Sequence, residues 1–504
     1  MRSRFGRLAG ALTLGLASTI AVAQTDGQNN RPARAPGGVL SLINGVTISP
    51  ECGQHASSVE HIAFSTTASH KFLGYGVSIE PSKAAANIQG TITILKKLGF
   101  AWVKVPLAEA DSAPGVSNDA TQAALEADLR ARLTAALPEP HKRLFEALHA
   151  AGIKVVDVIH RPPPDYFDTA AMTKSGKEGR RVKQGEIPQM AQYYAAYLRA
   201  LLGLGIHPDL VELINEPNLG RAGKFKPAMY AQFLKALETN LAERPLDVNL
   251  SAPATASARV PVALRFLDAM QAQDALAPLK AITLHTYYVR DQRNDEPPPA
   301  DEPAFKTIAA EAMKLGVPMI STEFGGTDVK TKLTDPGKES VDGAEEFKAA
   351  LDLIRNGESA AIVWTLYPNH REGETENTWA LIDANGPTNA YWLFYVLSRE
   401  IPVGSDVLAV KRTDVSPAMD SLGYAAFRSG RHVYVGLSNP APPRAAASVV
   451  LDISDLGRHG LVHAAAPLAN RAVESEAEFT PGTCPLNVTL PSGTSALLDI
   501  DELQ

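Results

Sequence analysis

A repeated alternation of short apolar runs and helical segments, between Leu73 and Ser398, is the feature that most constrains the fold. The apolar runs are short and end at turn residues or a proline, which is typical of buried strands. We predict strands over 74–79, 101–106, 153–159, 210–214, 248–251, 281–285, 317–323 and 360–364. Helical periodicity falls between them, most clearly over 88–98, 187–202, 227–241, 262–273 and 389–398. Eight strands, each followed by a helix, in roughly 325 residues match the count and size of a (β/α)8 barrel.

An open, doubly wound sheet is the alternative fold for the same alternation. That fold usually carries a glycine-rich phosphate turn after its first strand. The sequence has no such turn after Ile79. We therefore expect the α/β fold of a TIM barrel over residues 71–400.

The chain on either side of the barrel has β character. After Ile401 the helical period stops, and short β-rich runs separated by Pro and Gly indicate a C-terminal β-sandwich over 401–504. Residues 39–70 also contain short β-like pieces. A barrel's first strand begins near the end of its last helix, so we expect segment 39–70 to add strands to the sandwich.

The N-terminus carries a targeting signal. Three arginines at positions 2, 4 and 7 precede the apolar run 8–22, and Ala21-Val22-Ala23 matches a small-residue cleavage site. The run is short for a membrane anchor and contains Gly, Ser and Thr, so we predict a signal peptide over 1–23. A disordered leader over 24–38 follows. The mature protein is expected in the periplasm or secreted, with no membrane span.

Charge and composition exclude some functions. The formal net charge is -7, which gives no basic footprint for nucleic acid. No group of residues has the spacing of a metal site, and we expect neither a metal nor a cofactor. Only two cysteines occur, Cys52 and Cys484, and in an oxidising compartment we expect them to form a disulfide, with two free thiols as the alternative.

Two glutamates end predicted strands. Glu216 follows the fourth strand in Asn215-Glu216-Pro217-Asn218, and Glu323 ends the seventh, before two glycines that permit a sharp turn. In a (β/α)8 barrel the chemistry lies at the carboxyl ends of the strands. Retaining glycoside hydrolysis needs two carboxyl groups that flank one bond, and the two strand ends can supply them.

These motifs resemble a family. Asn-Glu-Pro-Asn after strand four and Thr-Glu-Phe-Gly at strand seven resemble the clan A retaining glycosidases, which are built on (β/α)8 barrels. Asn-Glu-Pro-Asn-Leu and His285-Thr286-Tyr287 are similar to glycoside hydrolase family 39, and the flanking β-domain is similar to family 30. The resemblance covers about Gly74 to Ser398 and implies hydrolysis of an oligosaccharide or polysaccharide.

The resemblance also implies roles for single residues. Glu216 would be the general acid/base and Glu323 the nucleophile. Asn215 would bind the 2-hydroxyl of the sugar, Tyr287 would hold the nucleophile, and Trp364 would form an apolar floor under the ring. His285 and His160 are further candidates for the site. The alternatives for these supporting residues are a hydrogen-bonded core histidine and, for Trp364, ordinary barrel core.

Lys104 is a departure from the family pattern. The clan usually has an arginine near the end of strand two that supports the nucleophile, and here a lysine stands in Val103-Lys104-Val105-Pro106. A lysine gives a point charge instead of a planar fork. A lysine on a barrel strand can also form a Schiff base, so an aldolase is an alternative. A glycan-binding barrel without catalysis is another.

One loop is strongly basic. After strand three the sequence carries Lys174, Lys177, Arg180, Arg181 and Lys183, interrupted by Glu178. This loop leaves the catalytic face, and two interpretations stay open. It could contact an acidic polysaccharide, or it could be a solvated surface loop.

Overall fold

The computed structural model describes most of the chain after the N-terminal region. The described residues are 40–41, 46–50, 60–106, 121–137, 139–159, 166–172, 178–219, 224–256, 261–287, 303–325, 336–367, 380–383, 386–414, 422–440, 447–452, 460–468, 471–479, 485–491 and 493–501. The predicted signal peptide and leader lie outside these residues, as do both cysteines. Among the described helices, none combines the length and the apolar character that crossing a bilayer requires.

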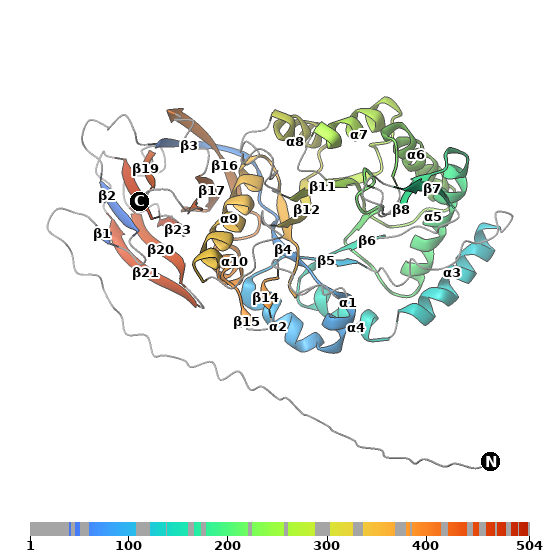
Figure 1. Ribbon diagram of the computed structural model, residues 1–504, viewed down its shortest axis with the longest axis horizontal. Helices are drawn as coiled ribbons and strands as arrows, with labels where there is room; N and C mark the ends of the chain where they lie inside the picture. The colour runs from blue at the N-terminus through green and yellow to red at the C-terminus, as the bar shows by residue number, and fades with distance from the viewer. Residues whose placement is uncertain are drawn as a thin grey trace, which may run out of the picture. The chain divides into compact units, whose positions relative to one another are not determined.

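The central unit is a closed barrel of eight parallel strands, in the order β10-β11-β12-β13-β4-β5-β6-β9 (Figure 1). The strands are β4 (Gly74–Ser78), β5 (Trp102–Pro106), β6 (Lys154–Val158), β9 (Leu210–Glu212), β10 (Leu250–Ala256), β11 (Leu279–Tyr287), β12 (Met319–Gly325) and β13 (Ala360–Val363). The predicted TIM barrel is therefore confirmed. Each predicted strand overlaps an observed one, although β10 extends beyond its predicted end at Ser251.

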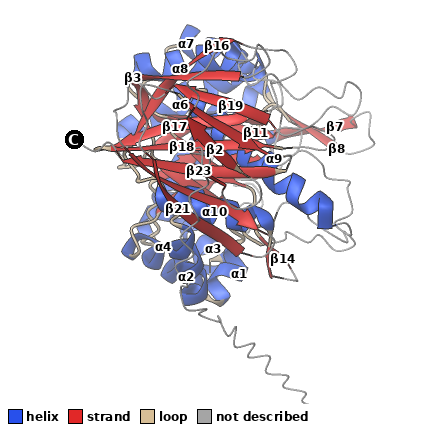
Figure 2. Ribbon diagram, turned by 90° about the vertical axis from the view of Figure 1, so that its left-hand side faces the viewer, coloured by secondary structure: helices blue, strands red, loops and turns tan. Residues whose placement is uncertain are grey.

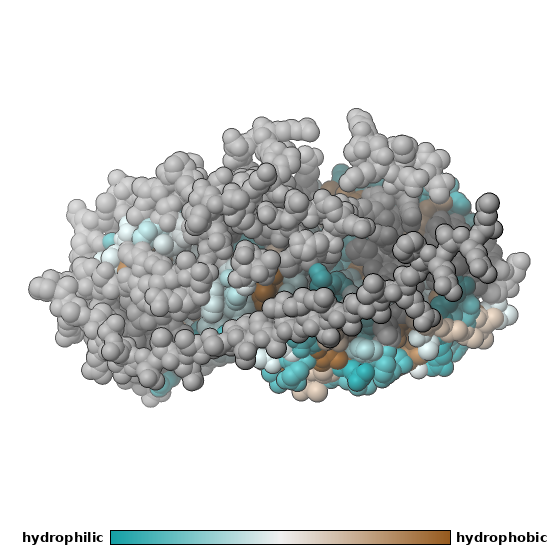
Figure 3. Space-filling view, turned by 60° about the horizontal axis from the view of Figure 1, so that its bottom comes forward, coloured by the Kyte–Doolittle hydropathy of each residue, from teal (hydrophilic) through white to brown (hydrophobic). Residues whose placement is uncertain are grey.

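Helices surround the barrel. They are α1 (Pro81–Ala86), α2 (Ile88–Leu98), α3 (Gln122–Ala136), α4 (Glu139–Ala150), α5 (Ile187–Gly203), α6 (Pro227–Glu243), α7 (Pro261–Ala272), α8 (Pro303–Leu315), α9 (Pro336–Arg355) and α10 (Asn389–Glu400). Their apolar faces join the outward side chains of the strands in one large hydrophobic cluster. On the face in Figure 3 the described surface is mostly hydrophilic, with hydrophobic residues in small separate areas.

The barrel interior is layered. One layer is apolar and includes Trp102, Leu210 and Ile320, all buried. Two residues further along the same three strands, the inward positions are Lys104, Glu212 and Thr322, which are fully buried. Because side chains alternate along a strand, this step of two sets a polar layer directly beyond the apolar one, toward the carboxyl ends of the strands.

The accessory unit is one sheet of eleven strands, in the order β1-β2-β22-β19-β3-β16-β17-β18-β23-β20-β21 (Figure 2). It contains β1 (Leu40–Ser41), β2 (Thr47–Pro50), β3 (Glu60–Lys71), β16 (Asp406–Asp414), β17 (Gly423–Ser429), β18 (His432–Asn439), β19 (Ala447–Asp452), β20 (Gly460–Leu468), β21 (Arg471–Phe479), β22 (Leu486–Leu490) and β23 (Thr494–Asp501). Strands from before the barrel thus pair with strands from after it, as the sequence predicts.

The two faces of this sheet pack differently. The side chains on one face, from strands including β2, β3, β18 and β23, form a hydrophobic cluster separate from that of the barrel. This cluster includes Ile48, Phe64 and Val435. Side chains of the opposite face, such as Val407, Phe427 and Leu497, belong to the barrel's own cluster. They lie against α9 and α10. The sheet is therefore curled around its own core on one side and joined to the barrel on the other.

Candidate active site

The fourth barrel strand brings Glu216 to the mouth of the barrel. Regular pairing of β9 ends at Glu212, and the chain turns before Pro217. The Glu216 N–H donates to the carbonyl oxygen of Ala254 on β10, at 3.1 Å. Glu216 has a φ of 52°, which is uncommon for a residue other than glycine. This left-handed backbone and the bond to β10 fix where the Glu216 carboxylate points.

An irregularity in β12 brings Glu323 into the interior. The pairing of β12 with both neighbouring strands shifts between Ser321 and Phe324. Thr322 and Glu323 both make contacts inside the barrel, while Phe324 returns to the outer cluster. The Ser321 hydroxyl donates to the carbonyl oxygen of Glu323 at 3.1 Å. Two successive inward side chains are what a β-bulge produces, and here the second of them is the predicted nucleophile.

Lys104 joins Glu323 to a third carboxylate. The Lys104 Nζ lies 2.8 Å from Oε1 of Glu323 and 2.8 Å from Oε1 of Glu212. Burial works against the charge of Lys104, but the two carboxylates outweigh it and raise the pKa of the lysine. Burial works against the charge of Glu212 too, but Lys104 and His285 lower its pKa to about 2. All three groups are therefore charged at neutral pH.

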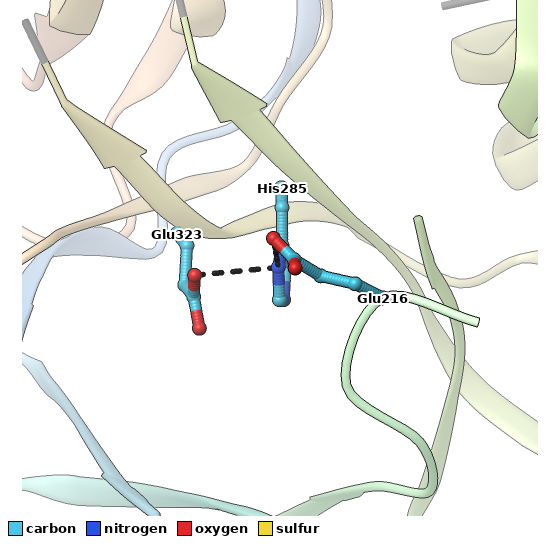
Figure 4. A group of neighbouring side chains, drawn as sticks. All are labelled: Glu216, His285 and Glu323. Atoms are coloured by element: carbon cyan, nitrogen blue, oxygen red, sulfur yellow. Dashed lines mark hydrogen bonds and ion pairs between the residues drawn. The ribbon is translucent and has the colours of Figure 1, made fainter. Parts of the chain in front are cut away.

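His285, on β11, lies between the two predicted catalytic glutamates (Figure 4). Its Nδ1 is 3.4 Å from Oε1 of Glu216 and 3.3 Å from Oε2 of Glu323, and its Nε2 is 3.0 Å from Oε1 of Glu212. Burial lowers the pKa of His285, but the attraction of Glu323 and Glu212 exceeds this effect and raises the pKa to about 9. The inner cluster then holds two cations, Lys104 and His285, against the carboxylates of Glu212 and Glu323.

Tyr287 completes the contacts of Glu323. Its hydroxyl donates to Oε2 of Glu323 at 2.6 Å. Burial and the adjacent carboxylate raise the pKa of the phenol, so it remains a donor. Burial would raise the pKa of Glu323, but His285 and Lys104 lower it. Glu323 is thus held as an ionised carboxylate.

Glu216 has a different environment. Its side chain is 12% exposed, and among the described residues His285 is the polar side chain that contacts its carboxylate. Ligand atoms of Glu216, His285 and Glu323 all lie within 4.8 Å of one another. The two glutamates therefore face one common space but differ in their contacts. Glu323 is held by several polar side chains, whereas Glu216 has fewer contacts and is more exposed.

The remaining predicted site residues lie as follows. Asn215 is buried, and its Oδ1 has no hydrogen-bond partner among the described residues, so this acceptor is available. Trp364 is half-buried and belongs to none of the hydrophobic clusters of the described chain. A Cβ at Gly325 would meet the Trp364 carbonyl and the Tyr287 ring at 3.6 Å, so both residues flank the turn after Glu323. His160 lies outside the described residues.

Glu212 belongs to the site although the sequence motifs do not identify it. It is fully buried, and Thr322 donates to its second oxygen at 2.5 Å. The available signal was a single glutamate inside an otherwise apolar strand. Such a carboxylate needs a buried cation, and Lys104 at the inward position of another strand was a candidate.

A second missed carboxyl lies behind the strands. Glu358 is fully buried, its Oε1 accepts from the Thr286 hydroxyl at 3.5 Å, and its Oε2 has no partner among the described residues. The Ser321 hydroxyl lies within hydrogen-bond distance of Thr286 Oγ1, at 3.2 Å, and of the Glu323 carbonyl oxygen. Burial raises the pKa of Glu358 well above its ordinary value, so the folded protein favours the protonated form of this group.

The fold and this site together define a class of architecture: a (β/α)8 barrel with an accessory β-sheet and a carboxylate pair at the ends of its fourth and seventh strands. Solved structures share this architecture. A family 30 endoxylanase from Clostridium papyrosolvens is similar with a TM-score of 0.60 and 15% identity, over 88% of this chain and 100% of that one. An endo-β-1,6-glucanase matches with a TM-score of 0.58 and 13% identity, over 88% of this chain and 94% of that one.

A glucosidase from Croceicoccus marinus matches with a TM-score of 0.54 and 14% identity, over 88% of this chain and 100% of that one. At these identities the likeness shows the fold. It agrees with the family 30 resemblance of the flanking β-domain. No family model matches the sequence, and no curated protein matches it.

Proposed function

We propose that this protein is a retaining glycoside hydrolase that cleaves an oligosaccharide or polysaccharide. The observation that carries the proposal is the pair Glu216 and Glu323, whose nearest oxygens lie within 4.8 Å of each other at the barrel mouth. Retaining enzymes separate their two carboxyl groups by about 5–5.5 Å, and inverting enzymes by about 6.5–9.5 Å to admit a water. The names of the similar structures, a xylanase, a glucanase and a glucosidase, support the same reaction class.

In the first step Glu323 is the nucleophile. Its ionised carboxylate forms a bond to the anomeric carbon of the sugar while the bond to the leaving oxygen breaks. Glu216 gives its proton to that oxygen. The contacts of Glu323 with Lys104, His285 and Tyr287 fit this role, because they keep the carboxylate charged and oriented.

In the second step Glu216 acts as the base. It takes a proton from water, whose oxygen attacks the anomeric carbon and releases Glu323. The Oδ1 of Asn215, which has no partner in the described part of the chain, is an acceptor for the sugar 2-hydroxyl, and the half-buried Trp364 offers a flat apolar surface for the ring.

The test is chemical rescue with stereochemical analysis. Glu323→Ala should abolish turnover of an aryl glycoside, and azide should restore it with a glycosyl azide of inverted configuration. Glu216→Ala should act only on substrates with good leaving groups, and azide should give a product of retained configuration. Wild-type rates in both variants, or an inverted product from the unmodified enzyme, would contradict the proposal.

The two alternatives from the sequence have less support. A Schiff base requires a neutral lysine amine, and Lys104 is held as an ammonium by two carboxylates at 2.8 Å. A glycan-binding barrel needs no pair of glutamates with unequal environments. Borohydride trapping with a carbonyl substrate tests for the aldolase, and hydrolysis of aryl glycosides separates the enzyme from the binder.

We also propose that the enzyme is exported, on the basis of the N-terminal arginines, the apolar run 8–22 and the cleavage site at Ala23. N-terminal sequencing of protein from the periplasm or the medium should begin at Gln24. An intact N-terminus on protein retained in the cytoplasm would contradict this.

A further inference from the structure

Four basic residues on the catalytic side of the barrel form a strip of two adjacent segments. The strip consists of Arg181 and Lys183, at the end of β8 (Glu178–Val182), and Lys224 and Lys226, which precede α6. Strand β8 pairs with β7 (Phe167–Met172) in a hairpin, where the sequence predicts a loop. The Val182 N–H donates to the carbonyl oxygen of Lys224 at 3.3 Å, so the two segments lie side by side.

The four basic side chains of the strip point outward, because side chains alternate along each extended segment. Val182, between Arg181 and Lys183, is buried, and so is Phe225, between Lys224 and Lys226. Both apolar side chains belong to the barrel's hydrophobic cluster. Arg181, Lys224 and Lys226 are exposed, and Lys183 is half-buried. Since neighbouring residues of an extended segment point to opposite sides, the buried pair fixes the basic side chains on the solvent side.

Among the described residues, no carboxylate neutralises the exposed cations of the strip. Within the described part of the chain, no ion pair joins Arg181, Lys224 or Lys226 to a carboxylate, although Asp168 is the cross-strand neighbour of Arg181. The 17-residue helix α6 begins immediately after Lys226, without a side-chain cap, and its N-terminal N–H groups add to the positive field. In a chain of net charge -7 this is a local excess of positive charge.

The strip is tied to the proposed acid/base. The Phe225 N–H donates to the carbonyl oxygen of Pro217 at 2.8 Å, and Pro217 follows Glu216 directly. With neighbouring segments about 5 Å apart, the strip begins on the order of 10 Å from Glu216. A polymer bound across the mouth on the Glu216 side would therefore pass over it.

We propose that this strip binds the carboxylate groups of an acidic polysaccharide, so that the substrate is a uronate-containing glycan. The inference rests on the proposed glycosidase function. A nucleic acid is the less suitable polyanion, because Phe225, the aromatic residue between Lys224 and Lys226, is buried and offers no face for stacking of bases. Exposed cations beside the barrel mouth attract a carboxylated chain and increase its association rate.

The test is binding to polyuronates by the otherwise complete protein, carrying Glu323→Gln to prevent turnover. Polygalacturonate, polyglucuronate and alginate are titrated calorimetrically beside their carboxyl-reduced forms. We expect at least one polyuronate to bind, with a Kd that rises about tenfold in the triple variant Arg181→Gln, Lys224→Gln and Lys226→Gln, and also rises with salt. The reduced polymer should bind more weakly than its parent.

A matched control removes the same charge elsewhere. Lys96→Gln, Arg265→Gln and Lys280→Gln change exposed cations on α2, on α7 and near the start of β11, and this control should keep the wild-type Kd. Thermal unfolding verifies that both triple variants fold. The proposal is overturned if no polyuronate binds or if the strip variant has the same Kd as the parent protein. It is also overturned if the control variant loses as much affinity as the strip variant, or if single-stranded DNA competes equally well with the polyuronate. If the enzyme hydrolyses aryl glycosides but binds no polyuronate, only this inference is contradicted. If it binds polyuronate but the unmodified enzyme hydrolyses no glycoside, the proposed function is contradicted instead.

Discussion

Lys104 and Glu323 form a direct ion pair inside the barrel, with Nζ 2.8 Å from Oε1. The same ammonium group lies 2.8 Å from Glu212, a fully buried carboxylate that also contacts His285 and Thr322. The proposed nucleophile is therefore held by a cation whose charge is also balanced by a second carboxylate, that of Glu212. A lysine without that balance would be costly to bury.

Replacing Lys104 tests whether its charge supports the nucleophile. Lys104→Met should lower kcat about a hundredfold, because it removes a charge-assisted donor from the reacting carboxylate. Lys104→Arg should retain more activity, since it preserves the charge. Steady-state kinetics on an aryl glycoside, with circular dichroism to verify folding, gives the answer. Equal loss in both variants would indicate a packing role, and no loss in either would remove Lys104 from the site.

Glu212→Gln should destabilise the protein by about 3 to 5 kcal/mol, because Lys104 and His285 stay buried with one carboxylate less. The effect should depend on pH. The folded-state pKa of His285, about 9, lies above its ordinary value of 6.5, so its stabilisation is complete below pH 6.5 and is lost as the pH rises through 9. In Glu212→Gln the folded-state pKa of His285 should be lower, so the loss should still begin near pH 6.5 but be complete at a lower pH and be smaller in total. Denaturant unfolding between pH 6 and 10 measures both effects, and an unchanged profile would contradict the coupling.

Much of the fold could be predicted from the sequence, because buried parallel strands are short apolar runs and both glutamates end such runs. The exception is β10. The prediction ended it at Ser251, before Pro253, but the observed strand continues to Ala256. The register with β11 shifts between Pro253 and Thr255, and this irregularity allows a residue without an N–H inside a strand.

The inner cluster was only partly predictable. Lys104, His285 and Tyr287 were identified, because the resemblance covers their motifs. Glu212 was missed, since one charge inside an apolar run does not change how the run is interpreted. The contacts of Glu212 come from inward-facing side chains of three other strands, and the local sequence around Glu212 does not predict them. The bulge that turns both Thr322 and Glu323 inward is likewise a property of strand pairing.

Glu358 should make the protein less stable as the pH rises. Its folded-state pKa is raised, so above pH 4.5 the unfolded chain is ionised while the folded one keeps its proton, and unfolding becomes more favourable. Glu358→Gln keeps the shape and removes this ionisation. We expect the difference in Tm between variant and wild type to move in favour of the variant from pH 5 to pH 8. A constant difference would mean that Glu358 ionises normally in the folded protein.

Metal removal tests whether Glu216, His285 and Glu323 form a metal site or act in catalysis without a metal. These residues offer ligand atoms within 4.8 Å of one another, which is also the geometry of a metal site. The pKa of His285 is raised to about 9, and Lys104 Nζ lies 2.8 Å from Glu323, so these two side chains already supply positive charge to the cluster. Hydrolysis should therefore survive dialysis against EDTA and be unaffected by added Zn²⁺ or Mn²⁺ at micromolar concentration. Loss of activity with EDTA, restored by one metal, would overturn this.

The disulfide between Cys52 and Cys484 remains a prediction, because both cysteines lie outside the described residues. The adjoining strands give it a geometric basis. β2 pairs antiparallel with β22, with Ile48 opposite Val488 and Pro50 opposite Leu486. If this register continues for two more residues, it sets Cys52 opposite Cys484. Opposed residues of an antiparallel pair have Cα atoms about 4.5–5.5 Å apart, within the range that disulfides need.

The bridge would join positions more than 400 residues apart and fix the junction of the segments on either side of the barrel. The chain-entropy model then gives a stabilisation on the order of 5 kcal/mol, as an upper value. Cys52→Ser and Cys484→Ser should lower the Tm by the same amount, and the double variant should lower it no further, because either change removes the whole bridge. Mass spectrometry of a non-reduced digest of exported protein should show the two peptides linked. Both thiols free to alkylation, or additive losses of Tm, would show that the cysteines are unpaired.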